Sequence, residues 1–130
     1  MEKNEITLVD TSSWIEALRP KGRSDVRERV RALLVDDLAA WCDMVAVELW
    51  NGVQGDYEKK KLAELEKEIR CLPTSGEVWQ GARKLAQKCR SAGLTVPPAD
   101  LIIASCAFFH RVDIEHCDAH FDFIFKAHKK

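Results

Sequence analysis

The chain has 130 residues, of which 46% are hydrophobic and 32% are charged, with a formal net charge of −1 at pH 7. This size and composition fit one globular domain over residues 1–130, and the balanced charge excludes a globally basic nucleic-acid binder, so any such contact must use a local patch. Because the N-terminus has no signal-peptide pattern and no apolar run is long enough to span a bilayer, we expect a cytoplasmic protein without membrane contact.

The five cysteines form no C-x-x-C pair, and four of them lie in or beside apolar runs. An odd number of thiols without paired spacing is typical of free, buried cysteines in a reducing compartment. We therefore expect no disulfide framework.

Short apolar runs alternate with helical patterns along the first half of the chain. In chain order we expect a strand at 6–9, a helix from Thr11 to about Pro20, a helix from Ser24 to about Leu34, a strand at 39–42 and a helix over 44–53. Residues that can cap the following helix come directly after both strands.

The alternation continues in the second half. We expect a charged helix over 56–68, a strand at 69–72, an amphipathic helix from Ser75 to about Cys89, an almost wholly apolar helix over 99–110, a strand at 112–117 and a short packed segment at 121–125. Strands that alternate with helices are typical of an α/β protein with a mostly parallel central sheet. In such sheets, ligands bind beyond the carboxyl ends of the strands.

Four acids lie among apolar residues, where an unpaired carboxylate is costly to desolvate. They are Asp10 after the run ITLV, Glu48 inside VAVELW, Asp100 before LIIASCAFF, and Asp118 in HCDAHFD. Asp10 and Asp118 follow expected strands. Each acid also has a structural explanation on its own, namely a helix cap for Asp10, a solvated helix face for Glu48, the helix dipole for Asp100 and a turn for Asp118.

Taken together, the four carboxylates predict a site for Mg²⁺ or Mn²⁺, since these ions prefer oxygen ligands. Without a cation, the acids would repel one another and raise each other's pKa. One or two divalent ions held by such a cluster can activate water and stabilise the leaving oxygen of a phosphodiester. Three basic residues close in sequence to Asp10 are either phosphate contacts or part of a solvated helix surface: Arg19, Lys21 and Arg23.

Two other chemistries fit the sequence less well. His116 and His120 are four positions apart, but we expect strand and loop there, and no second Cys/His pair completes a tetrahedral zinc site. Cys106 lies in the most apolar helix, where a thiol is normally inert as a nucleophile.

The segments LVDTSSWIE, VAVELWNGV, PPADLIIASCA and HCDAHFD resemble, in order and spacing, the motifs of the PIN domain, and the DTSSW and ELWNG forms are similar to VapC-type toxins. The resemblance implies a three-layer α/β/α sandwich and a Mg²⁺- or Mn²⁺-dependent endoribonuclease acting on RNA. It implies that Asp10, Asp100 and Asp118 carry metal, that Glu48 completes the acidic set and that Ser12 supports Asp10. Many relatives have another acid where this chain has His120.

The resemblance also implies a homodimer and inhibition by a cognate antitoxin. If an inhibitor exists, we expect its apolar side chains to lie near Trp14, Leu18 and Trp50, and a cation of the inhibitor to enter the acid pocket. Two alternatives remain open. One is a PIN nuclease that processes RNA without an antitoxin, and the other is a catalytically inactive protein-binding module.

Overall fold

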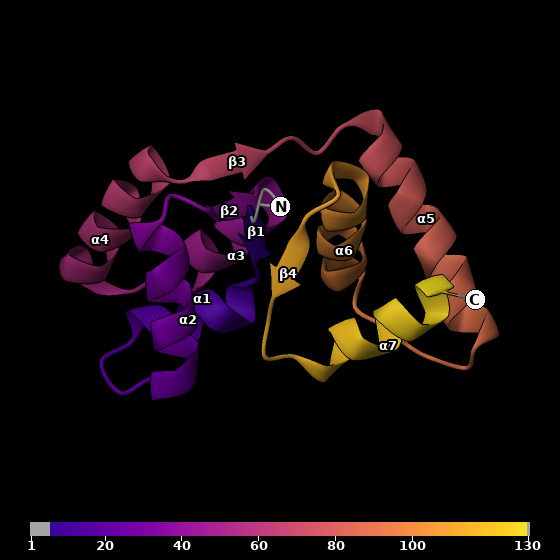
Figure 1. Ribbon diagram of the computed structural model, residues 1–130, viewed down its shortest axis with the longest axis horizontal. Coiled ribbons are helices and arrows are strands. Elements are labelled where there is room, and N and C mark those ends of the chain that lie inside the picture. Colours follow the sequence, from indigo (N-terminus) through magenta and orange to yellow (C-terminus); the bar gives the residue numbers. More distant parts are fainter. Residues whose placement is uncertain (1–5, 130) are drawn as a thin grey trace.

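Four short parallel strands form the centre of the fold (Figure 1). The computed structural model describes residues 6–129. The strands are β1 (Thr7–Val9), β2 (Ala39–Cys42), β3 (Arg70–Leu72) and β4 (Asp113–Glu115), in the spatial order β3-β2-β1-β4. Each neighbouring pair is parallel. The expected α/β class with a mostly parallel sheet is confirmed, and every expected strand is present.

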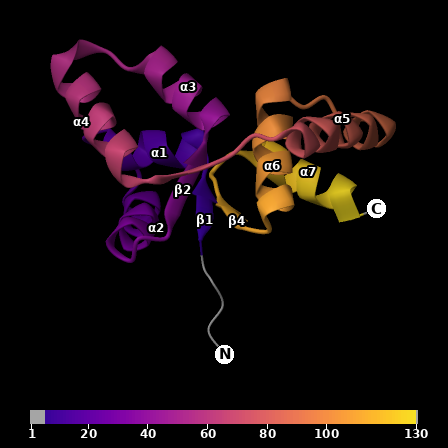
Figure 2. The same ribbon diagram turned by 90° about the horizontal axis from the view of Figure 1, so that it is seen from above.

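Helices cover both faces of this sheet. Within residues 6–129 they are α1 (Thr11–Leu18), α2 (Ser24–Val35), α3 (Asp43–Gly52), α4 (Gly55–Glu68), α5 (Gly76–Ser91), α6 (Pro98–His110) and α7 (Ala119–Lys129). Figure 2 shows α1, α2 and α4 on one side of the strands and α5, α6 and α7 on the other, which is the three-layer arrangement. Among these helices, none is long and apolar enough to cross a membrane.

The segment after β4 differs from the expectation. The strand expected at 112–117 is limited to Asp113–Glu115, and the packed segment at 121–125 belongs to a helix that spans Ala119–Lys129. Phe121, Ile124 and Ala127 are its buried residues, at a helical spacing of three. His120 therefore lies on a helix and not in a loop.

The core lies between the sheet and its helices. Trp14 and Trp41 are both buried and meet edge to face, with ring centroids 6.3 Å apart. Helix α6 is buried along most of its length, as its apolar sequence predicts. It lies very close to α5 at Gly81, where a Cβ would be only 2.4 Å from Ser105 Oγ. Only glycine fits this contact without a shift of the neighbouring side chain.

All five cysteines are free. Cys42, Cys89 and Cys106 are buried, as expected for thiols in apolar runs. Cys71 is exposed, because β3 is the edge strand of the sheet and its residues are covered less completely. The expectation of a buried thiol was therefore wrong for Cys71.

The parallel topology brings the carboxyl ends of β1, β2 and β4 to the same edge of the sheet. Asp10, immediately after β1, donates its backbone N–H to the carbonyl of Glu115 at the end of β4, at 2.9 Å. Residues that follow these two strands are consequently held side by side, although they come from opposite ends of the chain.

Candidate metal centre

Asp10 is fixed where β1 passes into α1. It is buried, it is the N-cap of α1, and its Oδ2 accepts hydrogen bonds from the backbone N–H of Ser12 at 3.0 Å and from Ser12 Oγ at 2.6 Å. Burial raises the pKa of the Asp10 carboxyl, and the hydrogen bonds from Ser12 work in the opposite direction. The cap explanation is therefore correct for Asp10, and it leaves the carboxylate held rigidly at the edge of the sheet.

Asp100 lies in the first turn of α6 and is also buried. Burial raises its pKa from 3.8 to about 6, and the nearby carboxylates of Asp118, Asp10 and Glu48 add to this shift, whereas His120 lowers it. A carboxyl group in the first turn of a helix gains from the helix dipole. The carboxylates that raise its pKa come from other elements, so Asp100 lies among acids and not merely at a helix end.

Asp118 and His120 complete this part of the cluster. Asp118 Oδ1 accepts a hydrogen bond from the backbone N–H of His120 at 2.9 Å. The Nδ1 atom of His120 lies 3.1 Å from Asp100 Oδ2 and 3.1 Å from Asp118 Oδ1. One ligand atom each from Asp100, Asp118 and His120 lies within 4.8 Å of the others, which is a spacing that one metal ion could bridge.

Glu48 approaches the cluster from α3. Thr11 Oγ1 donates a hydrogen bond of 2.6 Å to Glu48 Oε1. The Glu48 carboxylate is close enough to raise the pKa of both Asp10 and Asp100. The structure thus brings all four acids together, and the hydroxyl of Thr11, which was not among the candidate site residues, orients one of them.

The donor atoms suit a divalent cation of the first transition row or Mg²⁺. Carboxylate oxygens from separate elements converge on one edge of the sheet, and a bound cation would relieve their mutual repulsion. His120 Nδ1 is buried and has no hydrogen-bond partner among the described residues, despite its position beside two carboxylates. This atom is therefore available as a ligand atom beside the two carboxylates.

A family model described as the PIN domain matches residues 7–124. The chain belongs to the PIN-domain family. Ribonuclease VapC11 of Mycobacterium tuberculosis is 34% identical over 121 residues, covering 90% of each chain.

Two solved structures share the fold of this PIN domain. FitAcB from Neisseria gonorrhoeae has a TM-score of 0.76 at 25% identity, with 94% of this chain and 93% of that chain covered. VapBC2 from Rickettsia felis, bound to a DNA fragment from their promoter, has a TM-score of 0.74 at 16% identity, with 91% and 92% covered. The resemblance seen in the sequence is thus confirmed at the level of the family and of the fold.

A second layer of side chains supports the PIN-domain site. Ser12 Oγ accepts a hydrogen bond of 3.1 Å from the backbone N–H of Cys117, beside Asp118. Glu115 accepts hydrogen bonds from Arg29 Nε at 2.9 Å and from Ser13 Oγ at 3.1 Å. Glu115 was not among the candidates from the sequence, although an acid inside the expected strand at 112–117 was a usable signal.

The three basic candidates lie on the surface near α1 and α2. Arg19 forms an ion pair with Glu16 at 2.9 Å, and Arg23 forms one with Asp25 at 2.8 Å. Both arginines are therefore partly neutralised by acids of their own segment, while exposed Lys21 has no ion pair within the described part of the chain.

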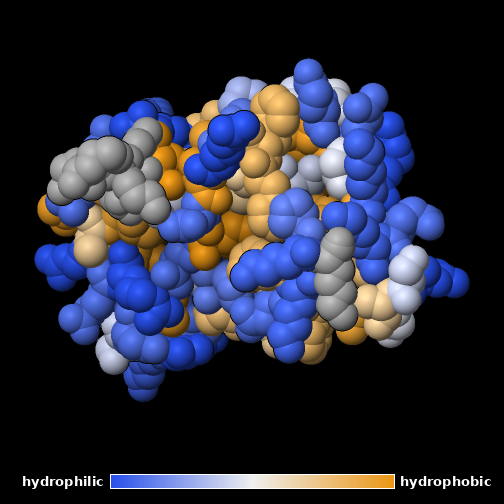
Figure 3. All heavy atoms as spheres, turned by 45° about the vertical axis from the view of Figure 1, so that its right-hand side comes forward, coloured by the Kyte–Doolittle hydropathy of each residue, from blue (hydrophilic) through white to orange (hydrophobic). Residues whose placement is uncertain are grey.

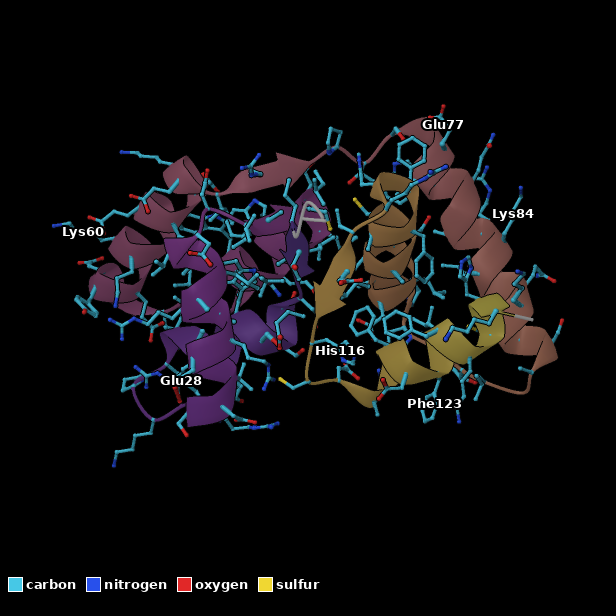
Figure 4. The ribbon with its side chains drawn as sticks, viewed as in Figure 1. Glu28, Lys60, Glu77, Lys84, His116 and Phe123 are labelled. Carbon is cyan, nitrogen blue, oxygen red and sulfur yellow. The ribbon has the colours of Figure 1, made fainter. Side chains whose placement is uncertain are left out.

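His116 has a packing role in this PIN domain. Its ring lies 5.1 Å from that of Phe121 and 5.7 Å from that of Phe125, and its Nδ1 accepts a hydrogen bond of 3.3 Å from the backbone N–H of Asp118. Figure 4 shows His116 in the loop between β4 and α7, and Phe123 on the outer side of α7. His116 supports the loop that carries Asp118, whereas His120 faces the acids.

Proposed function

We propose that this PIN-domain chain is a divalent-metal-dependent endoribonuclease that hydrolyses RNA phosphodiester bonds, and that it is the toxin of a type II toxin–antitoxin pair. The observation that carries the proposal is the gathering of the four acids, with His120, at the carboxyl edge of a parallel sheet. The 34% identity to proteins named VapC ribonucleases supports the choice of RNA as substrate.

In this proposal, Asp10, Asp100 and Asp118 hold Mg²⁺ or Mn²⁺, and Glu48 completes the acidic set directly or through water. A bound divalent cation supplies the positive charge that polarises the phosphate and lowers the pKa of water. Ser12 holds Asp10 in place through a 2.6 Å hydrogen bond. Thr11 holds Oε1 of Glu48, and Oε2 is the oxygen through which Glu48 would take a proton from the attacking water.

We further propose that Arg19, Lys21 and Arg23 contact the RNA backbone. Their side chains are exposed on the segment that follows Asp10. Contacts to phosphate weaken as salt concentration rises, because counterions compete for the same charges. Replacing Lys21 by Gln should therefore weaken RNA binding by a modest factor and reduce its dependence on salt, as measured by fluorescence anisotropy with a labelled RNA.

The test of the proposed activity is cleavage of RNA by the purified protein with and without Mg²⁺ or Mn²⁺. We expect Asp10→Asn and Asp100→Asn each to lower the rate by at least about 100-fold, the low end of what a positioned catalytic group contributes. The matched control is Asp113→Asn, which removes an exposed acid of β4 outside the cluster and should retain activity. Retained cleavage in both cluster variants, with circular dichroism showing an intact fold, would falsify the assignment.

A groove beside the acids is the place where we expect the antitoxin to bind. It has a volume of about 320 Å³ and is formed by α1, α3 and α4. Exposed apolar side chains of Ile15 and Leu18 line it, and Glu48 lies at its wall. A partner in this groove could therefore cover apolar surface and place a cation beside the acids, as expected from the sequence.

Two residues expected at this contact behave differently. Trp14 is fully buried in the core, so it is not available to a partner, and the expectation was wrong on this point. Trp50 is 38% exposed, but its indole N–H donates to Glu66 at 2.9 Å and thus ties α3 to α4.

The toxin role is tested by growth arrest on expression and its relief by a co-expressed neighbouring gene product. We expect Leu18→Glu to arrest growth but to escape this relief, because a buried charge would weaken the partner contact. Val35→Glu on α2, also at an exposed apolar residue, should still be relieved. RNA cleavage without growth arrest would favour an RNA-processing nuclease, and no cleavage with any divalent ion would favour an inactive binding module.

We also propose that the chain forms a homodimer in a reducing, cytoplasmic environment. Trp79 on α5 and Phe109 on α6 are exposed, and Figure 3 shows apolar residues across the middle of one face with hydrophilic residues on either side. Light scattering should give twice the monomer mass for the wild type and a lower mass for Phe109→Glu.

The free cysteines, three of them buried, support the proposed reducing compartment.

A further inference from the structure

The nitrogen atom of His120 sets this acid cluster apart from one built of oxygen ligands alone. We infer that His120 is a direct metal ligand through Nδ1, and that the mixed nitrogen and oxygen site prefers first-row transition ions such as Mn²⁺ and Co²⁺ to Mg²⁺. This inference rests on the proposed metal site and concerns which ion that site selects.

The first argument is the position of Nδ1. It lies 3.1 Å from one oxygen of Asp100, on α6, and 3.1 Å from one oxygen of Asp118, just before α7. Ligand atoms that bind one ion at about 2.1 Å in neighbouring coordination positions lie about 3 Å apart. The three atoms therefore already have the mutual spacing of ligands to a shared ion.

The second argument is that Nδ1 is buried and makes no hydrogen bond with the described residues, although both oxygens are within reach. A buried polar atom without a partner is costly, so its presence calls for an explanation. Neither carboxylate lies in line with an N–H on Nδ1, whereas a metal ion bound between the three groups would use the nitrogen lone pair.

The third argument is that the imidazole is held in place before any ion binds. The backbone N–H of His120 donates to Asp118 Oδ1 at 2.9 Å, which fixes the start of α7. The next residue, Phe121, is fully buried and anchors the helix. These contacts fix the backbone of His120 beside the acids, while its side chain remains 39% exposed.

The chemical consequence follows from the preferences of the ions. Mg²⁺ prefers oxygen ligands and gives up its water reluctantly. Imidazole nitrogen instead favours transition ions, and their affinity for such a site increases from Mn²⁺ to Co²⁺. An imidazole in place of a carboxylate also removes one negative charge, which weakens binding of Mg²⁺ most because that binding is almost purely electrostatic. The competing explanation is that His120 itself pairs with both carboxylates in place of the metal.

The experiment is pulsed electron paramagnetic resonance of Mn²⁺ bound to the full chain, combined with calorimetric titrations of Mg²⁺ and Co²⁺. His120→Asp supplies an oxygen ligand at the same position. His110→Gln is the matched control, because His110 contacts the carbonyl of Pro73 at the far end of α6 and not the acid cluster. None of these measurements depends on RNA cleavage.

We expect ¹⁴N coupling to Mn²⁺ in the wild type and in His110→Gln, and its loss in His120→Asp. We also expect the preference for Co²⁺ over Mg²⁺ to fall at least about tenfold in His120→Asp. Losing even a side chain that only hydrogen-bonds to a metal ligand changes metal affinity by about 10–100-fold. Mn²⁺ bound without ¹⁴N coupling, or coupling that persists in His120→Asp, would overturn the inference and leave the proposed metal site intact. Failure of the wild type to bind any of the three ions would overturn both.

Discussion

Asp100 shows how burial and repulsion between carboxylates affect a single residue of the site. Its pKa rises from 3.8 to about 6 because it is buried beside other carboxylates. The folded protein therefore holds this proton more tightly than the unfolded chain does. From this group alone, stability falls as the pH rises from about 4 to about 6, and the full loss persists above that range.

We expect Asp100→Asn to increase the free energy of unfolding at about pH 7.5 by roughly 1–3 kcal/mol in the presence of a chelator, since one pKa unit corresponds to about 1.4 kcal/mol. The difference from the wild type should be much smaller near about pH 4, where Asp100 of the folded protein is neutral and that of the unfolded chain is partly so. Urea denaturation of the two proteins at both pH values measures this. An equal difference at the two pH values would contradict the electrostatic explanation.

The hydroxyl of Ser12 connects the two parts of the site that come from opposite ends of the chain. It donates to Asp10 Oδ2 at 2.6 Å and accepts from the backbone N–H of Cys117 at 3.1 Å. We expect Ser12→Ala to destabilise the protein by about 1.5–3 kcal/mol, as for hydrogen bonds to charged groups, and to slow RNA cleavage. Ser91→Ala, at an exposed serine of α5, should change stability by less than about 0.5 kcal/mol in the same denaturation experiment.

At the scale of elements, the contact between α5 and α6 depends on Gly81. A Cβ at this position would lie 2.4 Å from Ser105 Oγ, and that hydroxyl is itself bonded to the carbonyl of Val78 at 2.6 Å. We expect Gly81→Ala to destabilise the protein by about 1–3 kcal/mol through overpacking, although alanine favours the helix.

Ser105→Ala provides the control for this contact because it removes the clashing atom and leaves only a Cβ at 3.7 Å. The double variant should be more stable than the sum of the single effects predicts. Gly76→Ala in the same helix meets open space and should not destabilise the protein. Thermal unfolding of the four variants measures these effects, and strict additivity of Gly81→Ala and Ser105→Ala would argue against a direct clash.

The elements differ in how well the sequence predicts them. Strand β2 and helix α6 were predictable, because each is an apolar run with a capping residue or a proline at one end. Helix α7 was not, because its polar residues obscure the three-residue spacing of Phe121, Ile124 and Ala127. The position of His120 depends on that helix, so its contact with Asp100 and Asp118 could not be predicted from the sequence.

The candidate site shows the same limit. The four acids could be identified from their apolar surroundings and from the family motifs. Their supporting contacts could not, because Thr11 meets Glu48 and Arg29 meets Glu115 only after folding. Similarly, only the three-dimensional packing shows that Trp14 faces the core and not a partner.

For the whole molecule, the proposed site joins elements that are far apart in the chain. Asp10 follows β1, Asp100 opens α6, and Asp118 precedes α7. A metal ion bound by all three should therefore stabilise the entire fold. We expect about 2.7 kcal/mol of added stability at an ion concentration 100 times the dissociation constant.

A thermal-shift experiment measures this effect. The melting temperature of protein treated with a chelator should rise by several degrees when Mn²⁺ is added. The rise should be lost in Asp10→Asn and retained in Asp113→Asn. An equal rise in all three proteins would place the ion elsewhere.

The hydrogen bond between Ser12 and Cys117 joins residues that are 105 positions apart. A ribosome therefore makes almost the whole chain before the two parts of the proposed site can meet. Until then, Asp10, Glu48 and Asp100 have neither Asp118 nor His120 beside them. If Asp118 and His120 hold the ion as proposed, a truncated chain that lacks β4 and α7 should neither bind the ion nor cleave RNA.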